Sequence, residues 1–72
     1  MLNLSIETND AHFSQAINFF YTKALKSKTL NAFIQSLNQI PCVEVGRGGN
    51  HIWIADVKKG KRLAIVTDLP WS

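Results

Sequence analysis

The chain has 72 residues, of which 46% are hydrophobic and 18% are charged, and its formal net charge is +3. A chain this short forms at most one domain with a thin core, so any functional site should lie on its surface. Its hydrophobic content excludes a disordered chain, and no apolar run approaches the roughly 18 residues of a membrane span, so no membrane partner is expected. The mildly basic charge permits a polyanionic partner without requiring one.

The cysteine content and the N-terminus bear on the cellular compartment. Cys42 is the only cysteine, so no disulfide can form within the chain. The opening residues, MLNLSIETND, lack the basic start and apolar core of a signal peptide. Together these features predict a protein of the reducing cytoplasm.

Two amphipathic helices are predicted in the first half of the chain, after an alternating segment over 2–7 that is a candidate edge strand. Residues 8–10, Thr-Asn-Asp, are typical of a helix start, because their side chains can accept hydrogen bonds from free N–H groups of the first turn. Apolar residues at helical spacing predict helices over 10–26 and 29–39, and Pro41 ends the second. These residues are Phe13, Ala16, Ile17, Phe20 and Ala24, followed by Leu30, Phe33, Ile34 and Leu37.

The last third of the chain changes to a period of two, which is typical of strands. Alternating apolar residues predict strands over 42–45, 52–57 and 63–67. The glycine-rich segment 46–50 is expected to join the first pair, and residues 58–61 the second. The predicted fold is α+β, with two N-terminal helices packed on a three-stranded antiparallel sheet and the N-terminal segment as a candidate fourth edge strand.

The segment 46–50, Gly-Arg-Gly-Gly-Asn, admits three interpretations. A phosphate cradle is the weakest, because glycine motifs that bind nucleotides run from a strand into a helix and this one runs into a strand. A hairpin turn needs the positive φ that glycine supplies. The third interpretation is a turn shaped to expose His51, and the residues alone do not decide between the last two.

The alternation of the strand after this turn determines which side chains accompany His51. His51 and Trp53 share one face, and Ile52 and Ile54 share the other. Branched aliphatic residues suit packing on helices, so His51 and Trp53 are expected on the exposed face, although the reverse stays open. An exposed indole can stack on a base, an imidazole can transfer protons, and cations can hold phosphates. The predicted single-stranded nucleic-acid surface comprises Arg47, Gly48, Gly49, Asn50, Trp53, Lys58, Lys59, Lys61 and Arg62 around His51.

Several segments of the chain resemble one known family. They are Lys28-Thr29-Leu30, the helix from Asn31 to Asn38, Pro41-Cys42-Val43-Glu44-Val45, Gly48-Gly49-Asn50-His51-Ile52-Trp53-Ile54 and Gly60-Lys61-Arg62-Leu63-Ala64-Ile65-Val66. In this order they are similar to the HicA toxins of HicA–HicB toxin–antitoxin systems, over about residues 28–70. The resemblance implies a fold like the double-stranded-RNA-binding domain (dsRBD) and an mRNA interferase that cleaves single-stranded RNA or mRNA without a metal or other cofactor. It places the catalytic histidine at His51, and it implies a HicB-like antitoxin that covers this histidine.

Two features depart from the family pattern. In the family, the third strand leads into a Pro-x-His segment and a C-terminal helix, whereas this sequence continues Thr67-Asp68-Leu69-Pro70-Trp71-Ser72. The helix predicted at 10–26 is additional, and it could occupy the place of the C-terminal helix on the sheet. These departures favour a second hypothesis, a small non-enzymatic phage-type inhibitor, such as an anti-CRISPR protein, that binds a host protein or nucleoprotein complex.

The remaining candidate residues carry weaker signals. The two histidines and the single cysteine show no metal-ligand spacing, so no metal site is expected. Phe19 and Tyr21 widen the apolar stripe of the first helix, which indicates burial on two sides or a homodimer contact. Trp71 lies in a polar tail and is expected either to fold back on the core or to anchor a partner.

Overall fold

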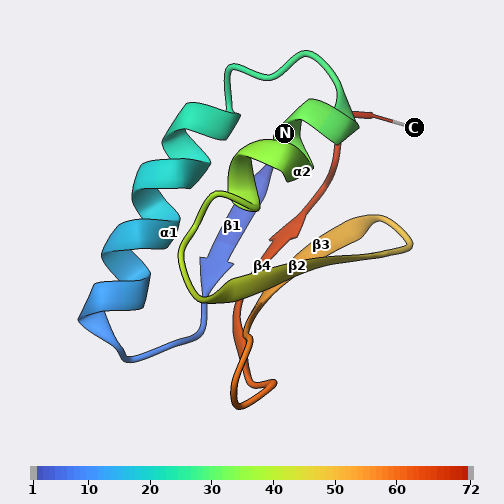
Figure 1. The fold of residues 1–72 in the computed structure, drawn as a ribbon. Coiled ribbons are helices and arrows are strands. Elements are labelled where there is room, and N and C mark those ends of the chain that lie inside the picture. Colours follow the sequence, from blue (N-terminus) through green and yellow to red (C-terminus); the bar gives the residue numbers. More distant parts are fainter. Residues whose placement is uncertain (1, 72) are drawn as a thin grey trace.

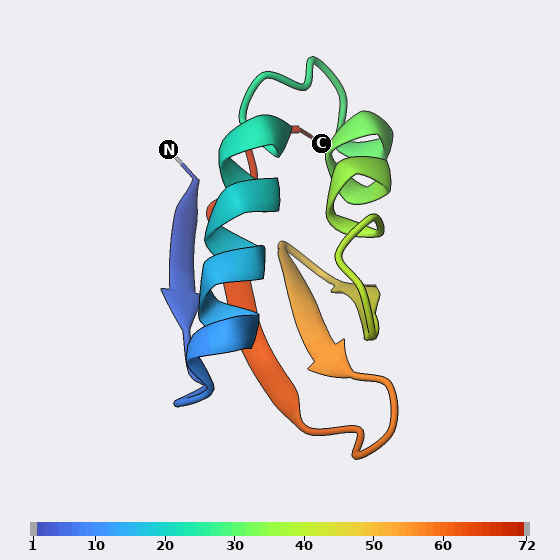
Figure 2. The same cartoon turned by 60° about the vertical axis from the view of Figure 1, so that its left-hand side comes forward.

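Four strands and two helices make up the structure, a computed structural model that describes residues 2–71 (Figure 1). In chain order they are β1 Asn3–Ile6, α1 Ala11–Ala24, α2 Leu30–Leu37, β2 Val43–Gly48, β3 His51–Asp56 and β4 Arg62–Thr67. The strands form one antiparallel sheet in the order β1-β4-β3-β2. Both helices lie over the same face of the sheet (Figures 1 and 2). Neither helix has the length and apolar character needed to cross a membrane.

The predicted α+β class is confirmed, but the sheet has four strands rather than three. The alternating N-terminal segment forms β1, which pairs with β4 from Asn3 opposite Thr67 to Ile6 opposite Ala64. As a result, β1 and β2 are the two edges of the sheet, and β3 and β4 are its centre.

Side-chain caps determine where both helices begin. Asp10 Oδ1 accepts hydrogen bonds from two backbone N–H groups of the first turn, at 2.9 and 3.4 Å, so α1 begins at Ala11. Thr29 Oγ1 accepts one from the N–H group of Ala32 at 3.1 Å and begins α2. Both helices end earlier than predicted, because an apolar stripe shows which helix face is buried but not where the last turn stops.

The core lies between the two helices and the inner face of the sheet. The largest fully buried side chains are Ile17, Phe33, Leu37, Ile52, Ile54 and Val66. Burying a side chain of this size contributes about 1.5–3 kcal/mol. The burial of Ile52 and Ile54 confirms that this pair packs on the helices, and the alternative with Trp53 in the core is wrong.

A β-bulge between β3 and β4 interrupts the alternation of β4. Strict alternation would put Leu63 on the same face as Ile65, but Leu63 is 4% exposed and belongs to the core. The register shifts between β3 and β4 at this point, so that Ile54 pairs with Ala64 and Ala55 with Arg62. The extra residue in β4 allows Leu63 and Ala64 to be buried together.

The glycine-rich segment is mostly strand, so the predicted loop over 46–50 is wrong. β2 extends to Gly48, which pairs with His51, and the turn consists of Gly49 and Asn50 alone. Gly49 has φ +51°, a conformation that tight hairpin turns require and that strains a residue with a side chain. The period of two continues through β2, but the glycines have no side chain to reveal it in the sequence.

The C-terminal segment folds back on the core, which was one of the two expectations for Trp71. Its indole Nε1 donates a hydrogen bond to the backbone carbonyl of Lys28 at 3.0 Å, and its ring centroid lies 5.2 Å from that of Phe33. Tyr21 also packs edge-on against Phe33, at 6.0 Å. Phe19, in contrast, is 58% exposed on α1, and the homodimer contact stays a prediction.

Candidate nucleic-acid interface

The outer face of the sheet, defined as the face opposite the helices, carries the predicted catalytic residue. Strand register and alternation assign to it Asn3, Ser5, Glu44, Gly46, Gly48, His51, Trp53, Ala55, Arg62, Ile65 and Thr67. His51, Trp53 and Ile65 are half-buried, so each presents part of its side chain to solvent. The expected pairing of His51 and Trp53 on the exposed face is therefore found.

Trp53 lies flat over a glycine of the neighbouring strand. Gly46 is its partner across β2 and β3. A Cβ atom added to Gly46 would lie 1.9 Å from Trp53 Cζ2, far inside any permitted contact. Only glycine at this position allows the indole to rest on the strand, where it forms an aromatic surface on which a nucleobase can stack.

His51 repeats this arrangement one step along the strand. Its partner is Gly48, and a Cβ atom added there would lie 3.1 Å from both Cε1 and Nε2 of the imidazole. His51 and Trp53 are two residues apart, so their Cα atoms are separated by about 6.7 Å. Two glycines of β2 thus seat an imidazole and an indole side by side on the open face.

Arg47 lies on the opposite side of the sheet from His51. It pairs with Ile52, whose side chain is buried under the helices. Arg47 lines a cavity of about 540 Å³ at the start of α2, together with Lys28, Thr29, Leu30, Asn31, Pro70 and Trp71. Although Arg47 and Gly48 are neighbours in sequence, the structure does not place the guanidinium beside the imidazole.

The lysines of the β3–β4 loop are also separated from His51. Lys59, Lys61 and Arg62 line a second cavity, of about 280 Å³, at the start of α1. That cavity also contains Glu7, Asp10 and Asp56. Arg62 donates two hydrogen bonds to the carboxylate of Glu7, at 2.7 and 3.1 Å, so its charge is paired.

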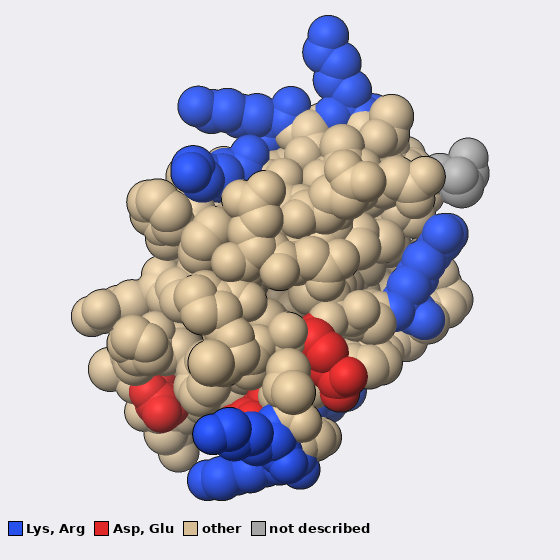
Figure 3. Space-filling view, in the orientation of Figure 1, with Lys and Arg blue, Asp and Glu red and all other residues tan. Residues whose placement is uncertain are grey.

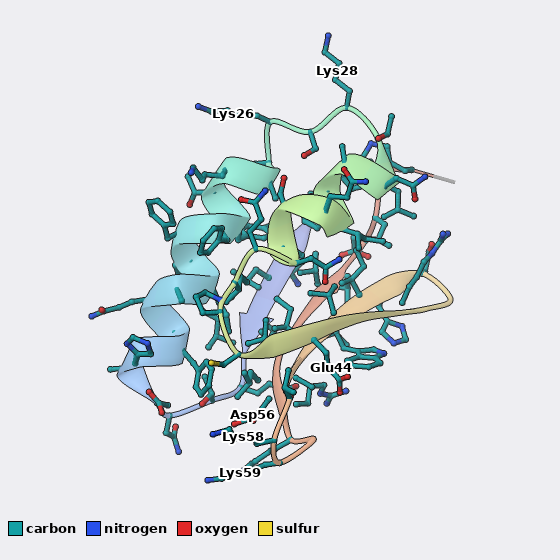
Figure 4. All side chains as sticks on the ribbon, viewed as in Figure 1. Lys26, Lys28, Glu44, Asp56, Lys58 and Lys59 are labelled. Carbon is teal, nitrogen blue, oxygen red and sulfur yellow. The ribbon has the colours of Figure 1, made fainter. Side chains whose placement is uncertain are left out.

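Figures 3 and 4 show the resulting distribution of charge. Lys and Arg side chains form separate groups at opposite ends of the view in Figure 3. Figure 4 identifies Lys26 and Lys28 at the connection between the helices, and Lys58 and Lys59 at the β3–β4 loop. β3 alone places about 17 Å between His51 and the start of that loop. The cations predicted around His51 thus lie in two separate regions, with Arg47 at the start of α2 and the others at or beside the β3–β4 loop.

Asp56 is a structural residue that the sequence analysis did not single out. Its Oδ1 accepts hydrogen bonds from the backbone N–H groups of Lys58 at 2.8 Å and Lys59 at 3.2 Å. An aspartate at the start of a glycine-containing loop is a known turn signal, because its carboxylate can bind amides two and three residues ahead. Asp56 therefore shapes the loop that turns Lys59 and Lys61 toward α1.

Other reactive side chains do not join the site. His12 lies exposed in the first turn of α1, in the helix layer, so His51 is the one imidazole of the outer face within residues 2–71. Cys42 is exposed at the start of the hairpin. No three His, Cys, Asp or Glu residues of the described chain come together as metal ligands.

Comparison of the chain with family models, curated proteins and solved structures finds no match. The function is therefore inferred from the side chains themselves, and from the resemblance carried by the segments between residues 28 and 70.

Proposed function

We propose that the protein is a HicA-like ribonuclease that binds single-stranded RNA on the outer face and cleaves it at His51 without a metal. The observation that carries the proposal is the placement of His51, which sits on Gly48 beside Trp53, on a sheet face that no helix covers. A base stacked on Trp53 would have a neighbouring phosphodiester within reach of the imidazole, about 6.7 Å along the strand.

His51 would act as a general base in this reaction. Neutral imidazole takes the proton from a ribose 2′-hydroxyl, the 2′-oxygen forms a bond to the adjacent phosphorus, and the bond from phosphorus to the 5′-oxygen breaks. The departing 5′-oxygen takes a proton from the imidazolium or from water. The products are a 2′,3′-cyclic phosphate and a 5′-hydroxyl, so neither an oxidant nor a metal is consumed.

The order of the elements is compatible with the proposal. α2, β2, β3 and β4 follow the element order of the HicA-like segments, with His51 directly after the Gly49–Asn50 turn. α1 lies beside α2 on the same sheet face, the place in which the family's C-terminal helix is expected (Figure 2). Under this proposal, the arrangement corresponds to a dsRBD-like domain with β1 added at one edge. A HicB-like antitoxin would inhibit such an enzyme by covering the outer face.

The test is cleavage of a mixed-sequence single-stranded RNA in the presence of EDTA. The parent should cleave, and His51→Ala should lose at least about 100-fold in rate, since general acid–base catalysis contributes about 10²–10⁴-fold. His12→Ala is the matched control, because it removes the other histidine from an exposed helical position. Full activity in His51→Ala, or no cleavage by the parent, would refute the ribonuclease.

One observation favours a non-enzymatic second candidate. The outer face, as the register assigns it within residues 2–71, contains the charged residues Glu44 and Arg62, and Arg62 is already paired with Glu7. A neutral surface with Trp53 and Ile65 at its centre suits a protein partner, as a phage-type inhibitor of a host protein would require. Such a partner would bind with little dependence on salt, and Trp53→Ala would abolish binding whereas His51→Ala would not.

A further inference from the structure

We infer that the RNA strand crosses the edge of the sheet at Gly48 and places a backbone phosphate in the cavity beside Arg47, on the helix side of the molecule. This inference rests on the proposed function. It assigns a phosphate subsite to the cavity at the start of α2, which lies outside the outer face.

β2 is an edge strand, so nothing in the sheet continues beyond it. Gly46 and Gly48 are the residues of β2 that share the outer face with Trp53 and His51. Because neither has a side chain, they do not block access to the edge of the sheet. Arg47 lies between them and projects to the other side. A strand that passes over His51 and continues outward therefore leaves the sheet over glycine and meets Arg47 directly beyond the edge.

The cavity beyond the edge has the size and charge to receive a phosphate. Its volume of about 540 Å³ lies within the range of small-molecule sites, and its charged lining residues are Lys28 and Arg47, with no acidic residue among them. The ion pair found within residues 2–71 is that of Arg62 with Glu7, so Arg47 has no carboxylate partner there. A guanidinium can bind two phosphate oxygens at once, which a lysine cannot do with the same geometry.

Trp71 gives the cavity a fixed aromatic wall. The indole is held by its hydrogen bond to the Lys28 carbonyl and by its contact with Phe33, at 3.0 and 5.2 Å. A base next to the bound phosphate can pack on this wall. The Lys28 side chain extends away from the body of the molecule in Figure 4 and adds positive charge at the rim. The chemical class of the ligand is consequently a nucleotide phosphate within a strand.

The alternative path, along β3 toward the lysine loop, is opposed by charge. Glu44 lies on the outer face opposite Ala55, between His51 and that loop (Figure 4). A phosphate on this path would pass this carboxylate, and the guanidinium of Arg62, on the other side of Ala55, is already paired with Glu7. Lys59 and Lys61, moreover, line the cavity that holds three acidic residues rather than the outer face.

The experiment measures binding of a fluorescein-labelled, 2′-O-methylated single-stranded oligoribonucleotide, which cannot be cleaved, over a range of salt concentrations. Arg47→Gln should weaken binding about tenfold at low salt. It should also make the slope of log K against log salt shallower by about 0.7, the value for one lost phosphate contact on a single strand. The matched control is Lys59→Gln, which removes the same charge from the other cavity and should change neither quantity. Arg47→Lys should restore the slope but only part of the affinity.

Equal effects of Arg47→Gln and Lys59→Gln would overturn this path while leaving the ribonuclease intact. So would tighter binding by Glu44→Gln, because it would place the strand along β3. Adenosine monophosphate is tested as a separate probe. If it binds through Arg47 as tightly as the oligonucleotide does, the cavity is a site for free nucleotides, and the proposed path of the RNA strand over Gly48 is wrong. A parent that binds no RNA overturns the path together with the proposed function, whereas a parent that cleaves RNA with Arg47→Gln unaffected overturns the path alone.

Discussion

Replacing Gly46 with alanine tests whether the glycine exists to seat the indole of Trp53. The added Cβ would lie 1.9 Å from Trp53 Cζ2 and 2.2 Å from Cε2. Carbon atoms in contact are about 3.5–4.0 Å apart, so the ring must leave its position by more than about 1.5 Å. Overpacking of this kind costs about 1–3 kcal/mol. The φ of Gly46 is not positive, so the backbone itself accepts alanine.

A double-mutant cycle separates the steric effect from the backbone effect. Urea unfolding followed by circular dichroism is measured for the parent, Gly46→Ala, Trp53→Leu and the double variant. We expect Gly46→Ala to cost about 1–3 kcal/mol with Trp53 present, and to be neutral or stabilising by up to about 1 kcal/mol with leucine, because alanine restricts the unfolded chain. Gly49→Ala is the control: its Cβ would meet open space, but its φ of +51° costs about 1–2 kcal/mol in either background. If Gly46→Ala lowered the free energy of unfolding equally with Trp53 and with leucine at position 53, the proposed role of Gly46 in accommodating the indole would be refuted.

Three further predictions address the loop, the core and the charge. Asp56→Ala removes the acceptor of two loop amides and should cost about 1 kcal/mol, with faster hydrogen exchange at those amides and unchanged RNA cleavage; unchanged exchange would contradict the assignment. Burial raises the pKa of the Tyr21 hydroxyl above its usual value. The protonated hydroxyl therefore contributes fully to the free energy of unfolding below about pH 10, and this contribution is lost as the pH rises through the pKa of the folded state. Because Tyr21 is the single tyrosine, tyrosinate absorbance reports it directly, and a midpoint no higher than in the denatured chain would be inconsistent with this burial. If Arg47 and Lys28 are the phosphate contacts, the salt slope of the parent should be about −1.4, and a slope steeper than about −3 would show that the loop lysines bind RNA as well.

The elements of the fold could be predicted because their signals are local. The caps Asp10 and Thr29 and the helical spacing of apolar residues indicate both helices, and the alternation around Ile52 and Ile54 indicates the buried face of β3. Packing then follows, because an amphipathic helix and a one-sided strand can bury their apolar faces only against each other. The exposure of His51 and Trp53 is a consequence of that single choice of face.

The site could be predicted only in part, because its remaining features depend on where strands end. Residues 46–50 are predicted as a loop, but β2 continues to Gly48. Its alternation puts Arg47 on the same face as Val45 and on the opposite face from Gly46. The bulge that buries Leu63 leaves no mark in the alternation. The orientation of Lys59 depends on hydrogen bonds of Asp56, and a charge count carries no information about direction.

The positions of two residues separate the candidate functions. An RNA ligand must be held through its phosphates. The one cation that the register assigns to the outer face within residues 2–71, Arg62, is paired with Glu7, so the guanidinium of Arg47 beyond the glycine edge becomes essential to binding. A protein partner needs only the neutral surface around Trp53 and Ile65, and Arg47 then takes no part. His51 distinguishes cleavage from binding, whereas Arg47 distinguishes a nucleic acid from a protein as the bound molecule. Gly46 and Gly48 support RNA binding in two ways. They make room for the rings of Trp53 and His51, and they leave the edge of the sheet open for the RNA strand.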